Sequence, residues 1–168
     1  MDLLDRIERS HFLGREFLVW LWFESERREG VVPLPGGEAC ELWLEDQLTL
    51  VSEGLEKAES KLKASAPSTT PEAKEALRQG KLPTKAKLRI ERGPQSWSFL
   101  FDADTLGVAR VKIPAQITEE GDEKFYERMQ LVEELEGMIG GLYERFLALR
   151  TSDAWPREAD ALRAWVLE

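Results

Sequence analysis

The stretch LPTKAKLRIERGPQSWSFLFD, residues Leu82–Asp102, decides the fold. Every second residue in its two halves is apolar, and these residues are Ala86, Leu88, Ile90, Trp97, Phe99 and Phe101. Successive side chains of a strand point to opposite faces of a sheet, so this period is typical of strands with one buried face. Turn residues, Gly93-Pro94-Gln95, separate the halves. The stretch therefore predicts an antiparallel hairpin whose second face is polar.

Weaker alternation on either side of this hairpin predicts further strands. Glu41–Val51 and Ala58–Ala64 both alternate, and Ser52-Glu53-Gly54 would be the loop of a hairpin between them. Their residues also favour helices, so the period of two is the main reason to expect strands here. We expect one more short strand within Leu106–Pro114.

The first segment, Met1–Glu26, predicts a helix that needs cover on every side. From Phe12 to Phe23 it is apolar almost all round, which is typical of a helix buried in the core or against a partner chain. The candidates for such a core or interface are Phe12, Phe17, Trp20, Trp22 and Phe23. Turn residues fill Gly30–Gly37, which is expected to break the helix.

A short helix is expected between the two hairpins. Thr70-Pro71-Glu72 combines an N-cap residue, a proline for the first helical position and an acid for the first turn. The helix would cover Glu72–Gln79 and end at Gly80, because glycine readily adopts the conformation that follows a helix.

The C-terminal part is predicted to be helical. Apolar residues recur at steps of three or four across Lys124–Leu149, at Met129, Val132, Leu135, Ile139, Leu142, Phe146 and Leu149. Glycines are poor helix formers, so those inside this segment suggest a bend or the close approach of another element: Gly137, Gly140 and Gly141. A last helix begins near Trp155-Pro156.

These elements predict a single α+β domain over residues 1–168. An antiparallel sheet of two hairpins, with a short helix between them, would be covered by the N-terminal helix and the long C-terminal helix. We expect an apolar helix at 1–26, a sheet region at 38–114 that contains the short helix at 71–79, and a helical part at 121–168.

Composition narrows the classes of function. The chain of 168 residues has one cysteine, Cys40, and one histidine, His11, which excludes an internal disulfide and a Cys/His zinc site. The longest apolar run, Phe17–Phe23, is too short to span a bilayer, and no signal peptide is visible. We therefore expect a cytoplasmic protein without a membrane partner.

Motifs for catalysis are lacking in the sequence. Neither a Gly-rich phosphate loop nor a nucleophile elbow is present. Asp102-x-Asp104 could hold Mg²⁺, but such pairs are more often turn residues that bond to the local backbone. We expect no enzymatic activity, no cofactor and no metal.

Charge is strongly segregated along the chain. The net charge is −9, yet ten basic and four acidic residues between Lys57 and Arg92 give that segment a charge of +6. Cations spaced along strands can follow a phosphate backbone without reading its sequence. The candidate DNA-binding residues are Lys61, Lys63, Lys74, Arg78, Lys81, Lys85, Lys87 and Arg89.

Two other interpretations of these residues stay open. A lysine-rich strand face is also the ordinary solvated surface of a sheet, where it protects edge strands. The apolar helix favours an oligomeric protein-interaction or scaffold module that has kept the fold without DNA binding. The basic segment would then contact an acidic protein surface, such as Glu119–Glu136 of another copy.

Three runs of sequence resemble the C-terminal half of the recombination-associated protein RdgC family. They are HFLGREFLVWLWFESE (His11–Glu26), TPEAKEALRQGKLPTKAKLRI (Thr70–Ile90) and WSFLFDADTLGVARVKIP (Trp97–Pro114). The order of the predicted elements is also similar, and the likeness covers roughly Phe12–Leu149. Family members are longer, and their N-terminal half has no counterpart in this sequence.

The resemblance implies a bacterial, nucleoid-associated protein that binds double-stranded DNA without sequence preference and is not an enzyme. Members of the family are closed dimeric rings with a positively charged hole, and they limit the access of the recombinase RecA to DNA. DNA contacts are implied at Lys61 and Lys63, and at the Gly80-Lys81 and Thr84-Lys85 positions. The chain would act as a homo-oligomer, or with a second chain in place of the missing half.

Overall fold

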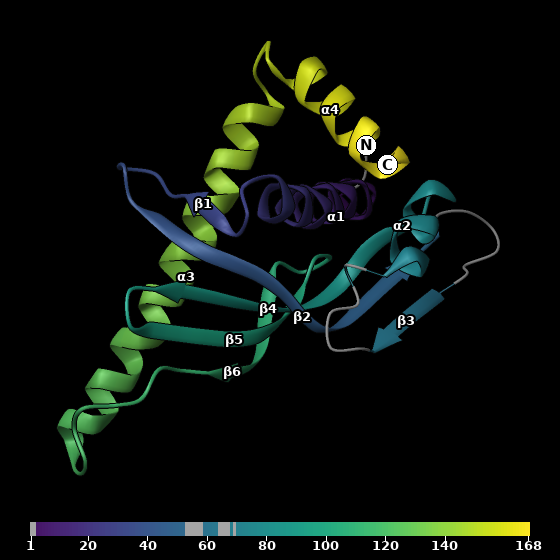
Figure 1. Ribbon diagram of the computed structural model, residues 1–168. Coiled ribbons are helices and arrows are strands. Elements are labelled where there is room, and N and C mark those ends of the chain that lie inside the picture. The colour runs from purple at the N-terminus through teal and green to yellow at the C-terminus, as the bar shows by residue number, and fades with distance from the viewer. Residues whose placement is uncertain (1–2, 53–58, 64–67, 69) are drawn as a thin grey trace.

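A six-stranded antiparallel sheet lies at the centre of the fold (Figure 1). The computed structural model describes residues 3–52, 59–63, 68 and 70–168. Its strands are β1 (Val31–Pro33), β2 (Ala39–Val51), β3 (Glu59–Lys63), β4 (Leu82–Arg92), β5 (Gln95–Asp102) and β6 (Gly107–Lys112). Their order is β1-β2-β4-β5-β6, with β3 paired to β2. The predicted α+β class with an antiparallel sheet is confirmed.

The long strand β2 joins the two predicted hairpins into one sheet. It pairs with β4 from Glu41 opposite Glu91 to Val51 opposite Leu82. On its other side, β2 pairs with β1 near its start and with β3 near its end. The loop predicted at Ser52-Glu53-Gly54 falls mostly outside the described residues, which resume at 59.

The strand β1 was not predicted, because the turn residues of Gly30–Gly37 hide it. Gly30 and Gly36 both have φ of +86°, a conformation that suits glycine. Between these two turns, Val31 and Val32 are extended and pair with Glu41 and Cys40 of β2. A segment of only three residues is too short for a periodic signal.

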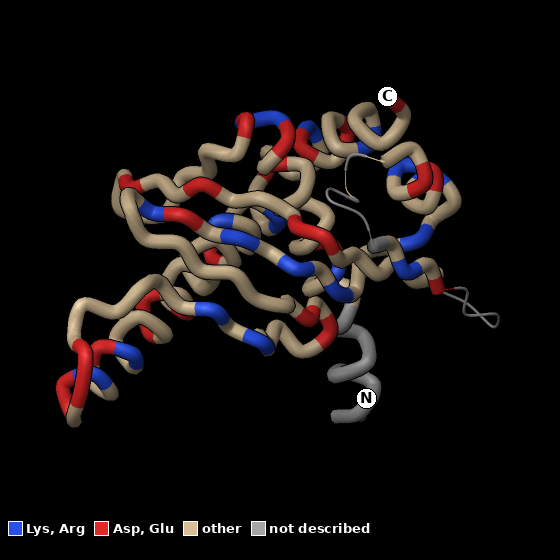
Figure 2. Tube along the Cα trace, turned by 60° about the horizontal axis from the view of Figure 1, so that its bottom comes forward, with Lys and Arg blue, Asp and Glu red and all other residues tan. Residues whose placement is uncertain are grey.

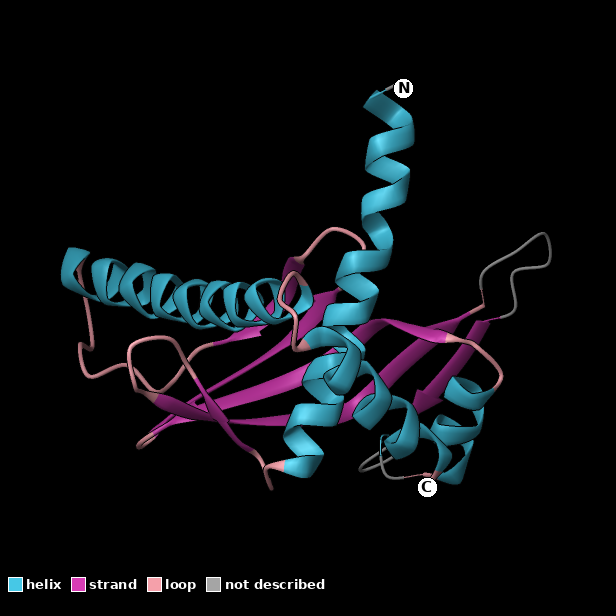
Figure 3. Ribbon diagram, turned by 90° about the horizontal axis from the view of Figure 1, so that it is seen from above, coloured by secondary structure: helices cyan, strands magenta, loops and turns pink. Residues whose placement is uncertain are grey.

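Four helices complete the described chain (Figures 1 and 3). They are α1 (Leu3–Arg27), α2 (Pro71–Arg78), α3 (Asp122–Arg150) and α4 (Trp155–Leu167). The sequence predicts all four, with α1 and α3 as the cover. The start of α2 is as expected, since the Thr70 side chain accepts a hydrogen bond from the Ala73 backbone N–H.

The apolar helix α1 is enclosed by its own chain. All residues from Phe17 to Ser25 are buried. The sheet covers one side of the helix, while Phe146 of α3 packs against Phe17 and Trp20. Trp165 of α4 packs against Trp22 and Phe23 in the same way.

This packing corrects the interface expected on the N-terminal helix. Phe17, Trp20 and Trp22 are fully buried and Phe23 nearly so, all within one chain. They are surrounded by the sheet, α3 and α4, so no partner chain is needed to bury them. Of the five candidates only Phe12 is exposed.

The long helix α3 packs with part of the face that was expected. Leu135, Leu142 and Phe146 are buried as predicted, together with Leu131 and Met138, whereas Met129 is exposed. A side chain added at Gly141 would lie 3.0 Å from Pro35, which confirms a close approach there. At Gly137 and Gly140 nothing lies within 4 Å of an added Cβ, so the same expectation is wrong for these two.

A fully buried carboxylate, Glu24, fixes the end of α1. Glu24 forms ion pairs with Arg27 and Arg28, at the C-terminal end of α1, and with Arg145 of α3 at 3.3 Å. Arg145 also donates to the backbone carbonyl of Pro33 at 2.8 Å. The cluster therefore ties α1 to α3 and to the end of β1.

Removing the charge of Glu24 should destabilise the whole domain. We expect Glu24→Gln to lower the free energy of unfolding by about 3 kcal/mol, because it leaves several guanidinium groups without their shared anion. Urea denaturation followed by tryptophan fluorescence measures the change. The matched control Glu144→Gln, on the exposed side of α3, should stay within about 0.5 kcal/mol of the native chain. Equal stabilities for the two variants would contradict this role.

Candidate nucleic-acid interface

The face of the sheet opposite α1 and α3 is not covered by any helix of the described chain. Figure 2 shows Lys and Arg positions spaced along neighbouring strands of the sheet, with acidic positions among them. On β4, the burial alternates as predicted, so that Lys85, Lys87 and Arg89 lie on the uncovered side. We call this side the open face.

Cations from three strands meet at one corner of the open face. Lys61 of β3 lies opposite Thr49 of β2, which in turn lies opposite Lys85 of β4. Together with Arg110 of β6, these side chains line a hollow of about 260 Å³. We call it the basic hollow. Gln47 also lines it, and Glu59 contributes one acid.

The cations of the basic hollow have little internal neutralisation. Lys85 and Arg110 are exposed and form no ion pair with any acidic residue that the structure describes. Lys61 pairs with Glu59 at 3.6 Å, but both side chains are at least half exposed. Pairs of this kind contribute little, since water screens them and the side chains remain mobile. The hollow is therefore a place where an external anion would find available donors.

Arg110 reaches the hollow through an irregularity in β6. Ser98 pairs with Lys112 and Leu100 pairs with Ala109, so Arg110 and Val111 of β6 lie opposite a single residue of β5 and form a bulge. Its φ is +51°, in the left-handed region that residues other than glycine rarely adopt. Bulges are known to re-aim side chains near functional sites. Here the residue in the bulge, Arg110, lines the same hollow as Lys85.

Arg110 and Lys112 are not among the candidates predicted from the sequence. Lys112 lies opposite Ser98, next to Arg89 across the open face, and is exposed. The signal was present, because both cations alternate with apolar residues within the predicted strand Leu106–Pro114. They fall outside the most basic segment, which was the feature used to choose candidates.

Lys87 and Arg89 lie on the open face as predicted but are paired with acids. Lys87 Nζ is 3.3 Å from Asp46 Oδ1. Arg89 lies between Glu45, at 3.3 Å, and Glu91, at 3.2 Å. The centre of the open face is therefore close to neutral, and the positive charge is concentrated at the basic hollow.

Lys74 and Arg78, two predicted DNA contacts, belong instead to the contact between α2 and α4. Lys74 Nζ donates to the Trp165 carbonyl at 2.8 Å and lies 3.5 Å from the centre of the Trp165 ring. Burial lowers the pKa of Lys74, against the opposing attraction of Glu26. Arg78 Nε donates to the Val166 carbonyl at 3.1 Å. Both cations satisfy the C-terminal end of α4, where carbonyl groups lack partners within the helix.

The last two DNA-binding candidates are Lys81, whose side chain the structure describes, and Lys63, for which it describes only the backbone. Lys81 Nζ donates to Ser60 Oγ at 2.7 Å and so links the start of β4 to β3. It is half-buried in this contact and does not line the basic hollow. Lys63 takes the position of β3 opposite Gln47, on the same side as Lys61 by register. Its side chain lies outside the described part of the structure.

Asp102 and Asp104 act in a turn rather than as a metal site. Asp102 Oδ1 accepts the backbone N–H groups of Asp104 and Thr105, and Asp104 pairs with Arg15 at 2.8 Å. Among the described residues, no three His, Cys, Asp or Glu side chains are grouped so that they could hold a metal ion. Burial raises the pKa of the Cys40 thiol to about 11, which makes it a poor nucleophile at neutral pH.

Comparison with known proteins adds no independent assignment. Neither a scan against protein-family models nor a search of curated proteins finds a match to the chain. None of the helices in the described parts is long and apolar enough to cross a membrane. The function is therefore inferred from the arrangement of the charged side chains.

The strain at Arg110 can be tested without any ligand. We expect Arg110→Gly to be at least as stable as the native chain, because glycine adopts a positive φ without steric cost. Ala109→Gly, at the neighbouring residue without a positive φ, is the control. It should cost about 0.5–1 kcal/mol, as glycine normally does inside a strand. Thermal unfolding measures both, and an equal loss in the two variants would contradict the strained bulge.

Proposed function

We propose that the chain binds double-stranded DNA without sequence preference, through phosphate groups held at the basic hollow. The observation that carries this proposal is the convergence of Lys61, Lys85 and Arg110 from three strands on one hollow. Lys112 extends the same positive region along β6. Binding rather than catalysis is proposed, because the described lining of the hollow includes no Ser, Cys or His.

The chemistry of the hollow suits phosphate. Arginine offers a planar set of donors that matches two phosphate oxygens, and lysine adds point charges. The Gln47 amide and the Thr49 hydroxyl supply neutral donors beside these cations. A backbone phosphate carries one negative charge and no sequence information, so contacts of this type position a duplex without reading bases.

Two features favour binding without sequence preference. No described helix stands on the open face, so the face lacks the element that most often enters a major groove. The available cations of the open face are also few, because Asp46, Glu45 and Glu91 neutralise Lys87 and Arg89. The remaining cations can contact phosphates but do not form a set that reads base edges. Four available cations would give a moderate affinity that depends steeply on salt.

The distribution of charge would orient DNA on this face. The chain is acidic overall, and the first turns of α3 carry Asp122 and Glu123. An acidic surface repels a duplex, whereas the basic hollow attracts it. The electrostatic field of the protein therefore favours encounters in which DNA approaches the basic hollow. The sequence resemblance to the RdgC family, whose members bind duplex DNA, supports the same proposal.

Salt dependence tests the proposal most simply. Four phosphate contacts predict that log K falls with log salt concentration with a slope of about −3 to −4. The variant Lys61→Gln/Lys85→Gln/Arg110→Gln should reduce the slope to about −1 and weaken binding at low salt, since each lost contact removes about 0.9. Fluorescence anisotropy of a labelled duplex of random sequence provides the measurement.

A control with the same loss of charge separates a local site from net charge. Lys124, Arg128 and Arg157 are exposed on α3 and α4 and lie outside the basic hollow. The variant Lys124→Gln/Arg128→Gln/Arg157→Gln should keep the native slope. Equal slopes for the two triple variants would refute the site, and absence of salt-dependent binding by the native chain would refute the function.

A further inference from the structure

A second apolar stripe runs along α3, beside the face that packs in the core. Its members are Phe125, Met129, Val132, Glu136, Ile139 and Tyr143. They follow one another at steps of four, three, four, three and four residues. This alternation is the heptad spacing by which one helix packs along another. One of the six positions, Glu136, is charged. We call this stripe the α3 seam.

The first two members of the α3 seam, Phe125 and Met129, are exposed. In Figures 1 and 3, this end of α3 projects past the edge of the sheet. Phe125 is 60% exposed and Met129 is 46% exposed. Large apolar side chains at this spacing are costly to leave in water, and grouped ones mark interaction surfaces.

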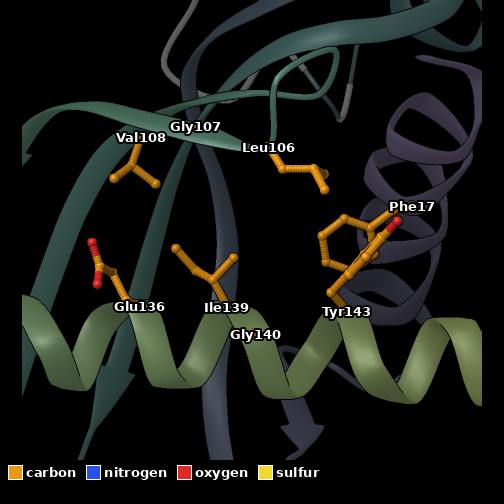
Figure 4. A pocket seen from close by; sticks show the side chains of 8 residues that line it. All are labelled: Phe17, Leu106, Gly107, Val108, Glu136, Ile139, Gly140 and Tyr143. Atoms are coloured by element: carbon orange, nitrogen blue, oxygen red, sulfur yellow. The ribbon is translucent and has the colours of Figure 1, made fainter. Parts of the chain in front are cut away.

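The C-terminal half of the α3 seam enters a pocket of about 320 Å³ (Figure 4). Ile139 and Tyr143 project into it from α3 and face Leu106 and Val108 of the turn and strand β6. Phe17 of α1 lines one end of the pocket. The pocket is therefore mainly apolar and has space for an incoming apolar side chain.

Gly140 has no side chain and so leaves space on this part of the surface of α3. It lines the pocket, and an added Cβ at this residue would meet nothing within 4 Å. No contact within the described chain thus requires glycine there. A glycine inside a helix costs about 1 kcal/mol relative to alanine. Gly140 therefore lowers the stability of the chain by itself and leaves the pocket open.

The charges beside the α3 seam select the kind of partner. Asp122, Glu133 and Glu136 are exposed, form no ion pair with the cations that the structure describes, and outnumber the exposed cations of the same turns, Lys124 and Arg128. On the seam itself, Glu136 occupies a position that faces the partner helix in heptad packing. A partner with Lys or Arg opposite Glu136 and along its flanks would neutralise these acids and fix the register.

We propose that the α3 seam and its pocket bind an amphipathic, basic α-helix of a partner protein. The heptad spacing calls for a helix, and the acidic residues call for lysine or arginine beside its apolar stripe. A second copy of α3 packed in parallel fits poorly, because Glu133 and Glu136 would lie close to their equivalents. An antiparallel copy is an outcome that sedimentation detects. This site lies apart from the basic hollow and does not depend on DNA binding.

A designed peptide tests the proposal. The probe is a labelled, helix-forming peptide with leucine at the two apolar heptad positions and lysine at the others. We expect it to bind the full chain at least about tenfold more tightly than a scrambled peptide of equal composition, or than the same peptide with glutamate for lysine. Fluorescence anisotropy at fixed salt gives the three affinities.

Paired variants locate the binding site. Phe125→Ser/Met129→Ser should weaken binding of the peptide about tenfold, whereas Tyr126→Ser should not. Tyr126 is an equally exposed aromatic residue on the same turn but off the seam. Gly140→Leu should block the pocket, while Gly137→Leu makes the same change outside it. An added Cβ meets nothing within 4 Å at either residue, so both variants are expected to fold.

Three outcomes would overturn the proposal. The first is equal affinity for the amphipathic and the scrambled peptide. The second is a loss of affinity that is the same in Tyr126→Ser as in Phe125→Ser/Met129→Ser. The third is a dimer of the chain, seen by sedimentation, that Phe125→Ser/Met129→Ser dissociates, because a second copy would then be the occupant.

Discussion

The burial of α1 on all sides is the constraint on which the rest of the structure depends. A helix with apolar residues around its whole circumference cannot be covered by one layer, so the sheet takes one side while α3 and α4 take the others. Aromatic contacts from Phe146 and Trp165 close the two remaining sides. The same enclosure forces Glu24 into the interior, where arginines from α1 and α3 must neutralise it.

Enclosing α1 uses one face of the sheet and leaves the other to solvent. The open face then shows the polar half of each alternating strand, and the bulge of β6 brings Arg110 to the corner where Lys61 and Lys85 lie. On the opposite side, α3 is longer than the core requires, so its acidic first turns project beyond the sheet. The molecule thus presents a basic hollow and an acidic apolar seam on separate surfaces. Such separation allows an acidic chain to bind two partners of opposite charge.

Periodicity predicted the elements well because it reports which side of a strand or helix is buried. The hairpin of Leu82–Asp102 and the start of α2 at Thr70 appear as expected. The short strand β1 was missed because three residues carry no period. Leu135, Leu142 and Phe146 of α3 are buried as predicted, whereas Met129 is exposed, because apolar residues surround much of that helix and only the position of the sheet decides which of them are buried.

The candidate site was harder to predict, since charge along a sequence does not say where side chains end. Lys74 and Arg78 bind carbonyl groups of α4, a partner nearly ninety residues away that no local pattern reveals. Lys85 could be placed by alternation alone, but Arg110 depends on a bulge.

The central claim is that DNA lies on the basic hollow, and lysine footprinting tests it most directly. Acetylation of each lysine, read by mass spectrometry with and without duplex DNA, should show protection of Lys61, Lys85 and Lys112. Lys124, on exposed α3, should react equally in both samples. Equal reactivity of Lys85 with and without DNA, or protection of Lys124 in its place, would contradict the account.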